Sequence, residues 1–410
     1  MMNYRLTLLS PVHIGSGRPL TPLDFVLENG SFAVMNLRKI LYAAPHRAEV
    51  FAAQAAEQSS TFMLADFLTK EERQGDEFRH YHAAVDTEID ALFHENKAQT
   101  GSGDVLEAIK TPCEHHVYIP GSTLKGALRT AFAYTTLRED ETLLQILKER
   151  LAHIEPHHSD EIVNDLLFWG ARRSPQFDLF RAVHVSESSC APATPETLAI
   201  AALKILSLYE ARKPERPRQG TMFKQLEAIR QNLSSCERSP LKPGWTFLEV
   251  LPGGSTFQGT LNIVEPLLQH RQFLHWNARH QQDVSHKALI NAANTFASDV
   301  CQWELDFFET QVHGLDVTPV LAFYRTLHTH IQHADSRCCF LCVGYGAGWH
   351  KLSIGLLLEK ASGVHFGKLR KDLRMASHRL QFPYPKSRKL LMTSANDIDT
   401  PLGWVRFELS

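Results

Sequence analysis

The chain has 410 residues, of which 43% are hydrophobic and 21% charged, and its formal net charge is −2. This composition is typical of an ordinary globular protein of two or three domains and excludes a disordered chain. No run of about 18 apolar residues occurs, which excludes a membrane-spanning helix and favours a cytoplasmic protein.

The first quarter of the chain is predicted to begin with strands and to continue with helices. Residues 2–10 alternate polar and apolar side chains and predict a strand that ends at Pro11. Residues 24–36 predict a hairpin, because the Asn29-Gly30 pair between two apolar runs suits a type I′ turn. From about 45 to 100 the periodicity is helical and the outer faces are acidic, which predicts a peripheral helical insertion.

In the middle of the chain, residues 115–137 predict a short strand that turns at Pro120-Gly121 into a helix. Two more helices are expected near 140–152 and 159–169. Residues 179–187 and 198–210 predict a pair of strands. The loop at 211–220, with four basic residues and two prolines, is a candidate linker.

The last third mixes strands and helices again. Residues 245–265 predict a hairpin that turns at Pro252, Gly253 and Gly254. The remaining expected elements are helices at about 266–277, 286–310 and 319–332, a strand, glycine loop and short helix within 338–360, and strands at 387–394 and 402–410. Strands and helices without a regular βαβ rhythm favour an α+β fold with two sheets.

The sequence IPGSTLKGALRTAF is the strongest local motif. Ser122 is a suitable N-cap, and Lys125 and Arg129 stand one turn apart on one helix face. A helix start with free N–H groups and a nearby lysine can bind an anion, although the order of residues is not that of a P-loop. The alternative is an amphipathic helix whose basic side chains are only solvated.

A second motif, GYGAGWHK, carries Gly344, Gly346 and Gly348. The spacing differs from the Rossmann pattern and no acidic residue follows at the expected distance, which disfavours a dinucleotide site. Glycines still allow the backbone to approach a phosphate chain, and Tyr345 and Trp349 could stack on bases. The alternative is a tight loop that packs on its own sheet.

Histidines and cysteines are numerous but do not form a convincing metal motif. The 22 histidines and seven irregularly spaced cysteines lack paired zinc spacings, so we expect no metal, no cofactor and no disulfide. His13 follows the first strand and could act as a general acid in metal-independent RNA cleavage. A histidine that only packs in this loop is the simpler interpretation.

The net charge conceals a strong asymmetry. Residues 57–95 contain ten acids and three Lys or Arg, whereas residues 360–389 contain nine Lys or Arg and one acid. A basic region on an otherwise balanced protein is typical of proteins that bind a phosphate backbone, although a solvated charged face is also possible.

Five ordered stretches resemble the RAMP superfamily of CRISPR proteins and, within it, the fifth-subunit family of type III-A (Csm) effector complexes. They are LTLLSPVHIGSGRPLTPLDFVL, YIPGSTLKGALRTAF, DLFRAVHVSE, VGYGAGWHK and PLGWVRFEL. The resemblance implies two ferredoxin-like (RRM-like) units, at 1–220 with the helical insertion and at 221–410 with the glycine loop 344–348.

The resemblance also implies a role. A non-catalytic subunit of this kind caps the 3′ portion of crRNA, contacts a neighbouring Csm backbone RAMP subunit and a small helical subunit, meets target RNA indirectly and supports crRNA maturation. The residues that it places against RNA are Gly15, Ser16, Gly17, Ser122, Lys125, Arg129, Gly344, Gly346, Gly348 and Lys351, to which the stacking argument adds Trp349.

Two other functions remain open from the residues. The first is a metal-independent RAMP endoribonuclease that cleaves CRISPR repeat RNA with His13 as general acid. The second is a nucleotide-binding enzyme that uses the glycine loops. If the chain holds RNA by its sugar-phosphate backbone, binding is expected to be salt-sensitive and largely independent of sequence.

Overall fold

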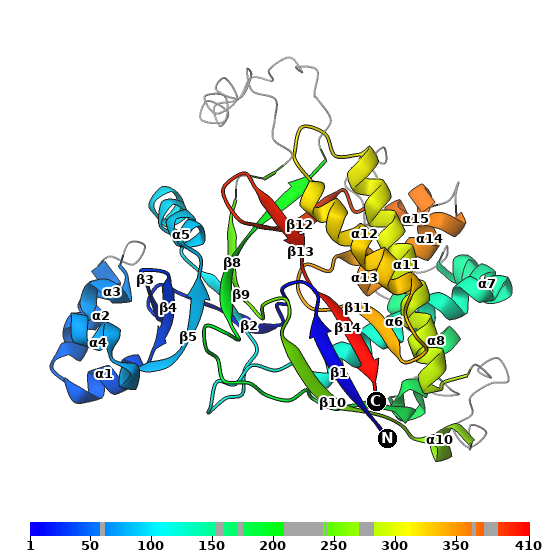
Figure 1. Ribbon diagram of the computed structural model, residues 1–410, viewed down its shortest axis with the longest axis horizontal. Coiled ribbons are helices and arrows are strands. Elements are labelled where there is room, and N and C mark those ends of the chain that lie inside the picture. Colours follow the sequence, from blue (N-terminus) through cyan, green and yellow to red (C-terminus); the bar gives the residue numbers. More distant parts are fainter. Residues whose placement is uncertain are drawn as a thin grey trace.

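The fold of the protein is seen in a computed structural model. The structure describes residues 1–57, 62–151, 159–169, 175–208, 241–242, 244–269, 283–362, 366–372 and 384–410. Two sheets are accompanied by helices (Figure 1), which confirms the α+β class. The candidate linker at 211–220 and the predicted domain boundary at residue 220 lie outside the described residues.

Five antiparallel strands form one sheet, in the order β11, β14, β1, β10, β7. Their bounds are Cys338–Cys342 for β11, Trp404–Leu409 for β14, Met2–Leu8 for β1, Thr256–Ile263 for β10 and Val183–Val185 for β7. Tyr4 lies opposite Gly259, where a Cβ would be 2.3 Å from the Tyr4 hydroxyl oxygen. Glycine is therefore required at this position by the neighbouring tyrosine.

The second sheet has nine strands, with the main path β2, β6, β9, β8, β5, β4, β3 and with β12 and β13 joined to it through β8. Their bounds are Gly15–Leu20 (β2), Phe25–Glu28 (β3), Ser31–Met35 (β4), Arg79–Val85 (β5), Val105–Ala108 (β6), Ala199–Ser207 (β8), Thr246–Val250 (β9), Ser387–Met392 (β12) and Ile398–Pro401 (β13). Two of its pairings, β5 with β8 and β6 with β9, are parallel.

The helices form two groups (Figure 1). The peripheral group is α1 (Leu37–Ala43), α2 (Arg47–Glu57), α3 (Leu64–Phe67), α4 (Lys70–Gln74) and α5 (Thr87–Thr100). The larger group is α6 (Gly121–Glu139), α7 (Glu141–Leu151), α8 (Ser159–Leu167), α10 (Glu265–Gln269), α11 (His286–Thr310), α12 (Thr318–Gln332), α13 (Trp349–Leu352), α14 (Gly355–Ser362) and α15 (Phe366–Asp372). Short 3₁₀ turns lie at Asp76–Phe78, Pro175–Phe177 and Leu179–Ala182.

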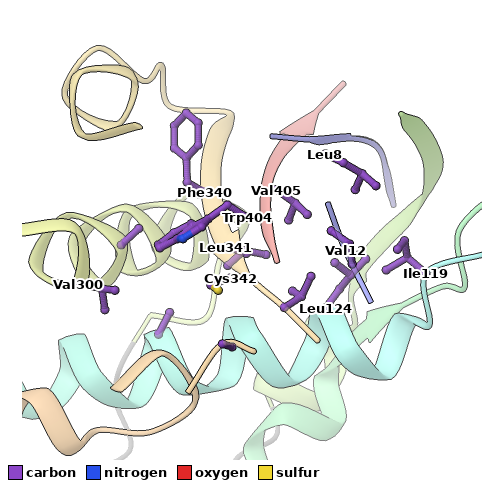
Figure 2. Packing of buried hydrophobic residues seen from close by; sticks show 14 of the residues in the cluster. Leu8, Val12, Ile119, Leu124, Val300, Phe340, Leu341, Cys342, Trp404 and Val405 are labelled. Carbon is purple, nitrogen blue, oxygen red and sulfur yellow. The ribbon is translucent and has the colours of Figure 1, made fainter. Parts of the chain in front are cut away.

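The core next to the five-stranded sheet brings together side chains from β1, β11, β14, α6 and α11 (Figure 2). Leu124 of α6 is fully buried and Trp404 of β14 is 1% exposed. The edge strand β11 is closed by Asn294 of α11, whose side-chain amide donates to the Cys338 carbonyl (2.8 Å) and whose oxygen accepts from the Phe340 amide (3.3 Å). This pairing covers backbone groups that an open edge would expose.

Several predicted elements are confirmed. The Asn29-Gly30 hairpin joins β3 to β4, with φ of 53° and 75° at the two turn residues. Helices α7, α8, α11 and α12 lie where the periodicity placed them, and β1, β11, β12 and β14 are the expected strands. For the helix predicted at about 266–277, the structure describes α10 over Glu265–Gln269, and residues 270–282 lie outside the described part.

Two predicted strand pairs are wrong. The strands flanking Pro252 to Gly254 do not pair as a hairpin, because β9 enters the nine-stranded sheet and β10 the five-stranded sheet. Likewise β7 pairs with β10, whereas β8 lies in the other sheet. A turn-rich segment between two apolar runs does not reveal that the chain changes sheet there.

The predicted helical insertion is only partly helical. Helices α1, α2 and α3 pack with β3 and β4 on a small core around Ile40 and Leu64, but β5 is a strand of the nine-stranded sheet. The alternating burial of Tyr81, Ala83 and Val85 shows the strand period that the sequence analysis read as the start of a helix.

Both sheets contain strands from either side of residue 220. β1 and β7 pair with β10 in one sheet, and β8 pairs with β9 and β12 in the other. The N- and C-terminal strands β1 and β14 are neighbours (Figure 1). The assignment of two ferredoxin-like units split at 220 therefore stays a prediction.

Candidate nucleic-acid interface

The link between the two sheets joins segments that are far apart in sequence. After β1 the chain crosses through residues 9–14 into β2, and Val12 exchanges two backbone hydrogen bonds with Leu251 (2.9 and 2.8 Å). The His13 carbonyl accepts a hydrogen bond from the Tyr345 amide (2.8 Å). His13 therefore lies between the early glycine motif (Gly15 to Gly17), which follows it in sequence, and the late glycine motif (Gly344 to Gly348), which contacts its carbonyl.

The early motif is open. Gly15, Ser16 and Gly17 form the exposed start of β2, and the Ser16 hydroxyl donates to Glu107 (2.8 Å). Gly17 has a φ of 94°, and a Cβ placed there would have no atom within 4 Å. The backbone at these positions is thus accessible from solvent, which a ligand that approaches the main chain requires.

The late motif is packed on its own chain. Gly344, Gly346 and Gly348 have φ of 75°, 87° and 77°. A Cβ on Gly344 would lie 2.3 Å from the His13 carbonyl oxygen, and one on Gly346 would lie 2.9 Å from Leu402 Cδ1. Only Gly348 has open space at its Cβ position. The first two glycines are therefore explained by contacts within the protein.

His13 is buried in this junction. Its residue surface is 2% exposed and its Nδ1 lies 2.6 Å from the carbonyl oxygen of Glu249. Burial lowers the pKa of His13, which favours a neutral imidazole. A general acid has to be protonated and within reach of the leaving oxygen, so this location argues against that role.

Glu249, whose backbone carbonyl contacts His13, also carries a buried carboxylate. This group was not predicted from the sequence. Glu249 is fully buried and accepts hydrogen bonds from the Tyr81 hydroxyl (2.8 Å), the Ala108 amide (2.8 Å) and the Lys110 ammonium (2.5 Å). Burial raises the pKa of this carboxyl. An acidic residue inside the apolar run FLEVL was the available signal, since such a group needs partners in a core.

The start of α6 differs from the prediction. Ser122 is not the N-cap: the helix begins at Gly121, and Pro120 occupies the cap position. The Gly121 amide donates to the Glu187 carboxylate (2.8 Å), and a Cβ on Gly121 would lie 2.2 Å from the Val185 carbonyl oxygen. A carboxylate of the chain itself thus already occupies this helix end.

Arg129 has internal partners. Its guanidinium forms two hydrogen bonds with Asp178 (both 2.7 Å), donates to Asn164 (2.9 Å) and lies 3.6 Å from the centre of the Phe168 ring. Lys125 is partly buried, and burial lowers its pKa. Ser122 in the same helix is exposed. Of the three predicted residues in α6, Ser122 is therefore exposed, Lys125 is partly buried and Arg129 is held by internal partners.

Trp349 and Lys351 lie in the interior or close to it. The Trp349 ring is partly buried, sits where a Cβ on Gly355 would come within 2.2 Å, and packs edge-on against Tyr384 at 5.0 Å between ring centres. Lys351 is 6% exposed and its ammonium lies 2.7 Å from Glu304. Neither side chain is therefore exposed as the predicted base stacking of Trp349 and RNA contact of Lys351 would require.

Glu304 links two cations in this buried site. Its second oxygen pairs with Arg388 at 2.6 Å, and the Arg388 guanidinium lies 3.7 Å from the centre of the Phe307 ring. The two positive neighbours lower the pKa of Glu304 to about 2, even though burial alone would raise it. The pKa of Lys351 is raised by the same carboxylate.

The structure thus sorts the predicted residues into three places. Gly15 to Gly17 are at the surface beside the packed loop 344–348, the α6 residues form a separate group with partners between 164 and 187, and Lys351 is internal. Of the basic run 360–389, residues 363–365 and 373–383 lie outside the described part, and the Lys389 ammonium lies over the Tyr345 ring at 3.5 Å from its centre.

The described residues hold neither a metal-ligand cluster nor a membrane-spanning helix. Within them, no three His, Cys, Asp or Glu side chains are grouped so that they could hold a metal ion. No helix in the described part of the chain is long and apolar enough to cross a membrane. The six described cysteines are free thiols, four of them buried.

Comparison with known proteins gives the family. The model of the RAMP superfamily matches residues 5–270. The chain belongs to the RAMP superfamily. The matched range of this RAMP protein includes the early glycine motif at residues 15–17, helix α6 and strand β10. It ends before the late glycine loop at residues 344–348.

Individual relatives point in the same direction. Csm5 of Streptococcus thermophilus, described as a CRISPR system Cms protein, is 27% identical over 193 residues, which are 45% of this chain and 51% of that protein. The match therefore spans about half the length of the curated relative.

Solved structures match over the whole chain. A chain in the cryo-EM structure of a Csm-crRNA-target RNA ternary complex of a type III-A CRISPR-Cas system has a TM-score of 0.68 at 20% identity, with 100% of both chains covered. Csm5 of T. onnurineus, from a crystal structure, has a TM-score of 0.64 at 18% identity over 98% of this chain and 99% of its own. The RAMP protein therefore shares their fold.

Proposed function

We propose that this RAMP protein is a non-catalytic subunit of a type III-A CRISPR ribonucleoprotein, where it binds the 3′ portion of crRNA and caps that end of the assembly. Its partners are a neighbouring Csm backbone RAMP subunit and a small helical subunit, and it meets target RNA indirectly. The observation that carries this proposal is the fold match over the full length to a chain of a Csm-crRNA-target RNA complex.

The exposed start of β2 supports the proposal. Gly15, Ser16 and Gly17 present a backbone without bulky side chains, which suits contact with a sugar-phosphate chain. The balanced net charge of −2 fits a subunit that shares a positive channel with its partners. RNA affinity should then fall with salt, with a log-log slope of about 0.7 per phosphate contact.

Reconstitution of the complex with and without this subunit tests the proposal. Complexes assembled without it should be shorter, and their crRNA should be incompletely matured at the 3′ end. Lys125→Ala is a suitable surface variant and should lower crRNA content. Arg129 is less suitable, because its loss breaks the contacts with Asp178. A complex of full length with mature crRNA in the absence of the subunit would contradict the proposal.

The alternative is a metal-independent endoribonuclease with His13 as general acid. The burial and lowered pKa of His13 favour the non-catalytic function. Incubation of the purified protein with CRISPR repeat RNA in EDTA separates the two. Cleavage that disappears in His13→Ala would establish the alternative. A nucleotide-binding function of the late loop has no support in its geometry, because Gly344 and Gly346 pack against the chain itself.

A further inference from the structure

Three side chains gather beside β2 from separate segments. Arg18 lies in β2, His80 in β5, and His115 in the turn between Lys110 and Val117. The ring centres of His80 and His115 are 4.8 Å apart. Arg18 is linked to them through a chain of contacts: its Nε lies 2.7 Å from Glu107, Glu107 lies 4.0 Å from the Lys110 ammonium, and that ammonium lies over the Tyr81 ring beside His115. None of the three residues lies at a position for which the sequence predicts a function.

The backbone of the turn holds His115 in an uncommon conformation. Its φ is 53°, and its amide donates to the Thr111 carbonyl (3.1 Å). The Tyr81 ring lies below it, with ring centres 5.5 Å apart. Positive φ values are uncommon for residues other than glycine, although histidine tolerates them better than most. The turn therefore fixes the position of this ring beside His80.

The polar groups of this cluster are available to a ligand. In the part of the chain that the structure describes, neither the His80 ring nor the His115 ring has a hydrogen-bond partner. The Arg18 side chain is 68% exposed, and its Nε donates to Glu107 (2.7 Å). That bond orients the guanidinium and leaves its two terminal nitrogens for another acceptor.

We propose that Arg18, His80 and His115 form a binding site for one phosphate group of single-stranded RNA, next to the open backbone of Gly17. A guanidinium and two imidazole N–H donors match the several acceptor oxygens of a phosphodiester. The ligand class rests on the proposed function, and the residues and their grouping come from the geometry above.

The site should couple RNA binding to proton uptake. In the free protein the pKa of both rings is lowered, first by burial and then by neighbouring groups, which are Arg18 for His80 and, in order, His80, Lys110 and Arg18 for His115. Glu107 acts in the opposite direction on His115, while Tyr81 and Glu249 face Lys110 from the sheet. A bound phosphate adds negative charge and raises both pKa values, so binding becomes tighter as the pH falls.

Fluorescence anisotropy of a labelled oligouridylate with the full-length chain tests this coupling. Affinity is measured at constant ionic strength between about pH 7.5 and pH 6, the range in which histidine titrates. The test variant combines His80→Gln with His115→Asn, because asparagine also tolerates positive φ. The matched control is His313→Gln, which changes an exposed histidine that has no hydrogen-bond partner among the described residues.

Wild-type protein and the His313→Gln control should bind tighter at the lower pH, by at most about tenfold for each ring whose pKa rises by one unit, a limit that is approached only below the pKa of the free ring. The double variant should lose this gain while it keeps the thermal unfolding midpoint of the wild type. An equal pH dependence in all three proteins would overturn the site even if reconstitution supports crRNA capping. Failure of the wild type to bind the oligonucleotide at any pH would also overturn it, whereas the proposed function is judged by assembly and crRNA maturation.

Discussion

The glycines at 15 and 17 and those at 344 and 346 lie on the two sides of His13, yet they face different surroundings. A Cβ on Gly17 would meet no atom within 4 Å, whereas one on Gly344 would lie 2.3 Å from a carbonyl oxygen of the chain itself. Both pairs allow a close approach of the backbone. In the late motif the approaching group is the protein. Of the early pair, Gly17 has free space for a ligand, whereas a Cβ on Gly15 would lie 3.2 Å from His13 Nε2.

The largest effect on the free energy of unfolding is expected at Glu304, the buried partner of Lys351 and Arg388. Glu304→Gln leaves Lys351 and Arg388 buried without their carboxylate, which should destabilise the fold by about 3 to 5 kcal/mol. Urea unfolding at neutral pH measures this change. Glu309→Gln removes an exposed ion pair with Arg325 and should cost about 1 kcal/mol or less. Equal costs would show that the late region is not held by this buried carboxylate.

The same carboxylate predicts a pH dependence of stability. The pKa of Glu304 is about 2 in the folded protein, against an ordinary value of 4.5. The stabilisation from this group is therefore complete above about pH 4.5 and is lost as the pH falls from there towards 2. Acid titration of the unfolding free energy should show a smaller loss over this window in Glu304→Gln than in the wild type.

The next effect compares two glycines of the late motif. Gly344→Ala adds a Cβ that overlaps the His13 carbonyl at a positive φ, so its cost should exceed about 2 kcal/mol. Gly348→Ala has open space, but a φ of 77° with a ψ of 173° is a conformation nearly restricted to glycine, so backbone strain alone should cost about 1 to 3 kcal/mol and Gly344→Ala should cost more. Urea unfolding of both variants decides the point. Equal losses would mean that the late loop is as open as the early one.

Substitution in the early motif should change the crRNA content of assembled complexes more than the free energy of unfolding. Gly17→Asn places a side chain over the open backbone, and we expect several-fold less crRNA in reconstituted complexes than with His13→Ala. Gly101→Asn is the matched control, because Gly101 also has positive φ and free space but lies at the end of α5. Asparagine accepts positive φ better than most residues with a side chain, and neither Cβ would meet an atom within 4 Å, so both variants should remain folded. Equal crRNA content in the Gly17→Asn and Gly101→Asn complexes would contradict the prediction that the open backbone at Gly17 contacts RNA.

Local signals in the sequence predicted local structure well. The Asn29-Gly30 turn and the long periodic helix α11 follow from residues that are close in sequence. The placement of β9 and β10 in different sheets cannot be predicted in this way. It depends on pairing of residues 251 and 259 with Val12 and Tyr4, which lie more than half the chain away. Sequence patterns show that a strand exists but not which sheet receives it.

The candidate site shows the same limit. The glycine and lysine positions were found from motifs, but burial decided which of them face solvent, and burial depends on distant partners such as Glu304 for Lys351. Arg18, His80 and His115 come from three segments with no shared motif. Their grouping required the register of β5 in the nine-stranded sheet, and that strand had been predicted as helix.

The smallest effect concerns the start of α6, which contrasts with the open start of β2. Ser122 lies inside the first turn and is exposed, whereas the Glu187 carboxylate accepts the Gly121 amide. Ser122→Ala should therefore change the unfolding free energy by less than about 0.5 kcal/mol, compared with about 1 kcal/mol for a true N-cap. Glu187→Gln should cost more than Ser122→Ala, because a charged acceptor at a helix start is lost. If the order of the two variants is reversed in urea unfolding, the serine and not the Glu187 carboxylate is the group that stabilises this helix end.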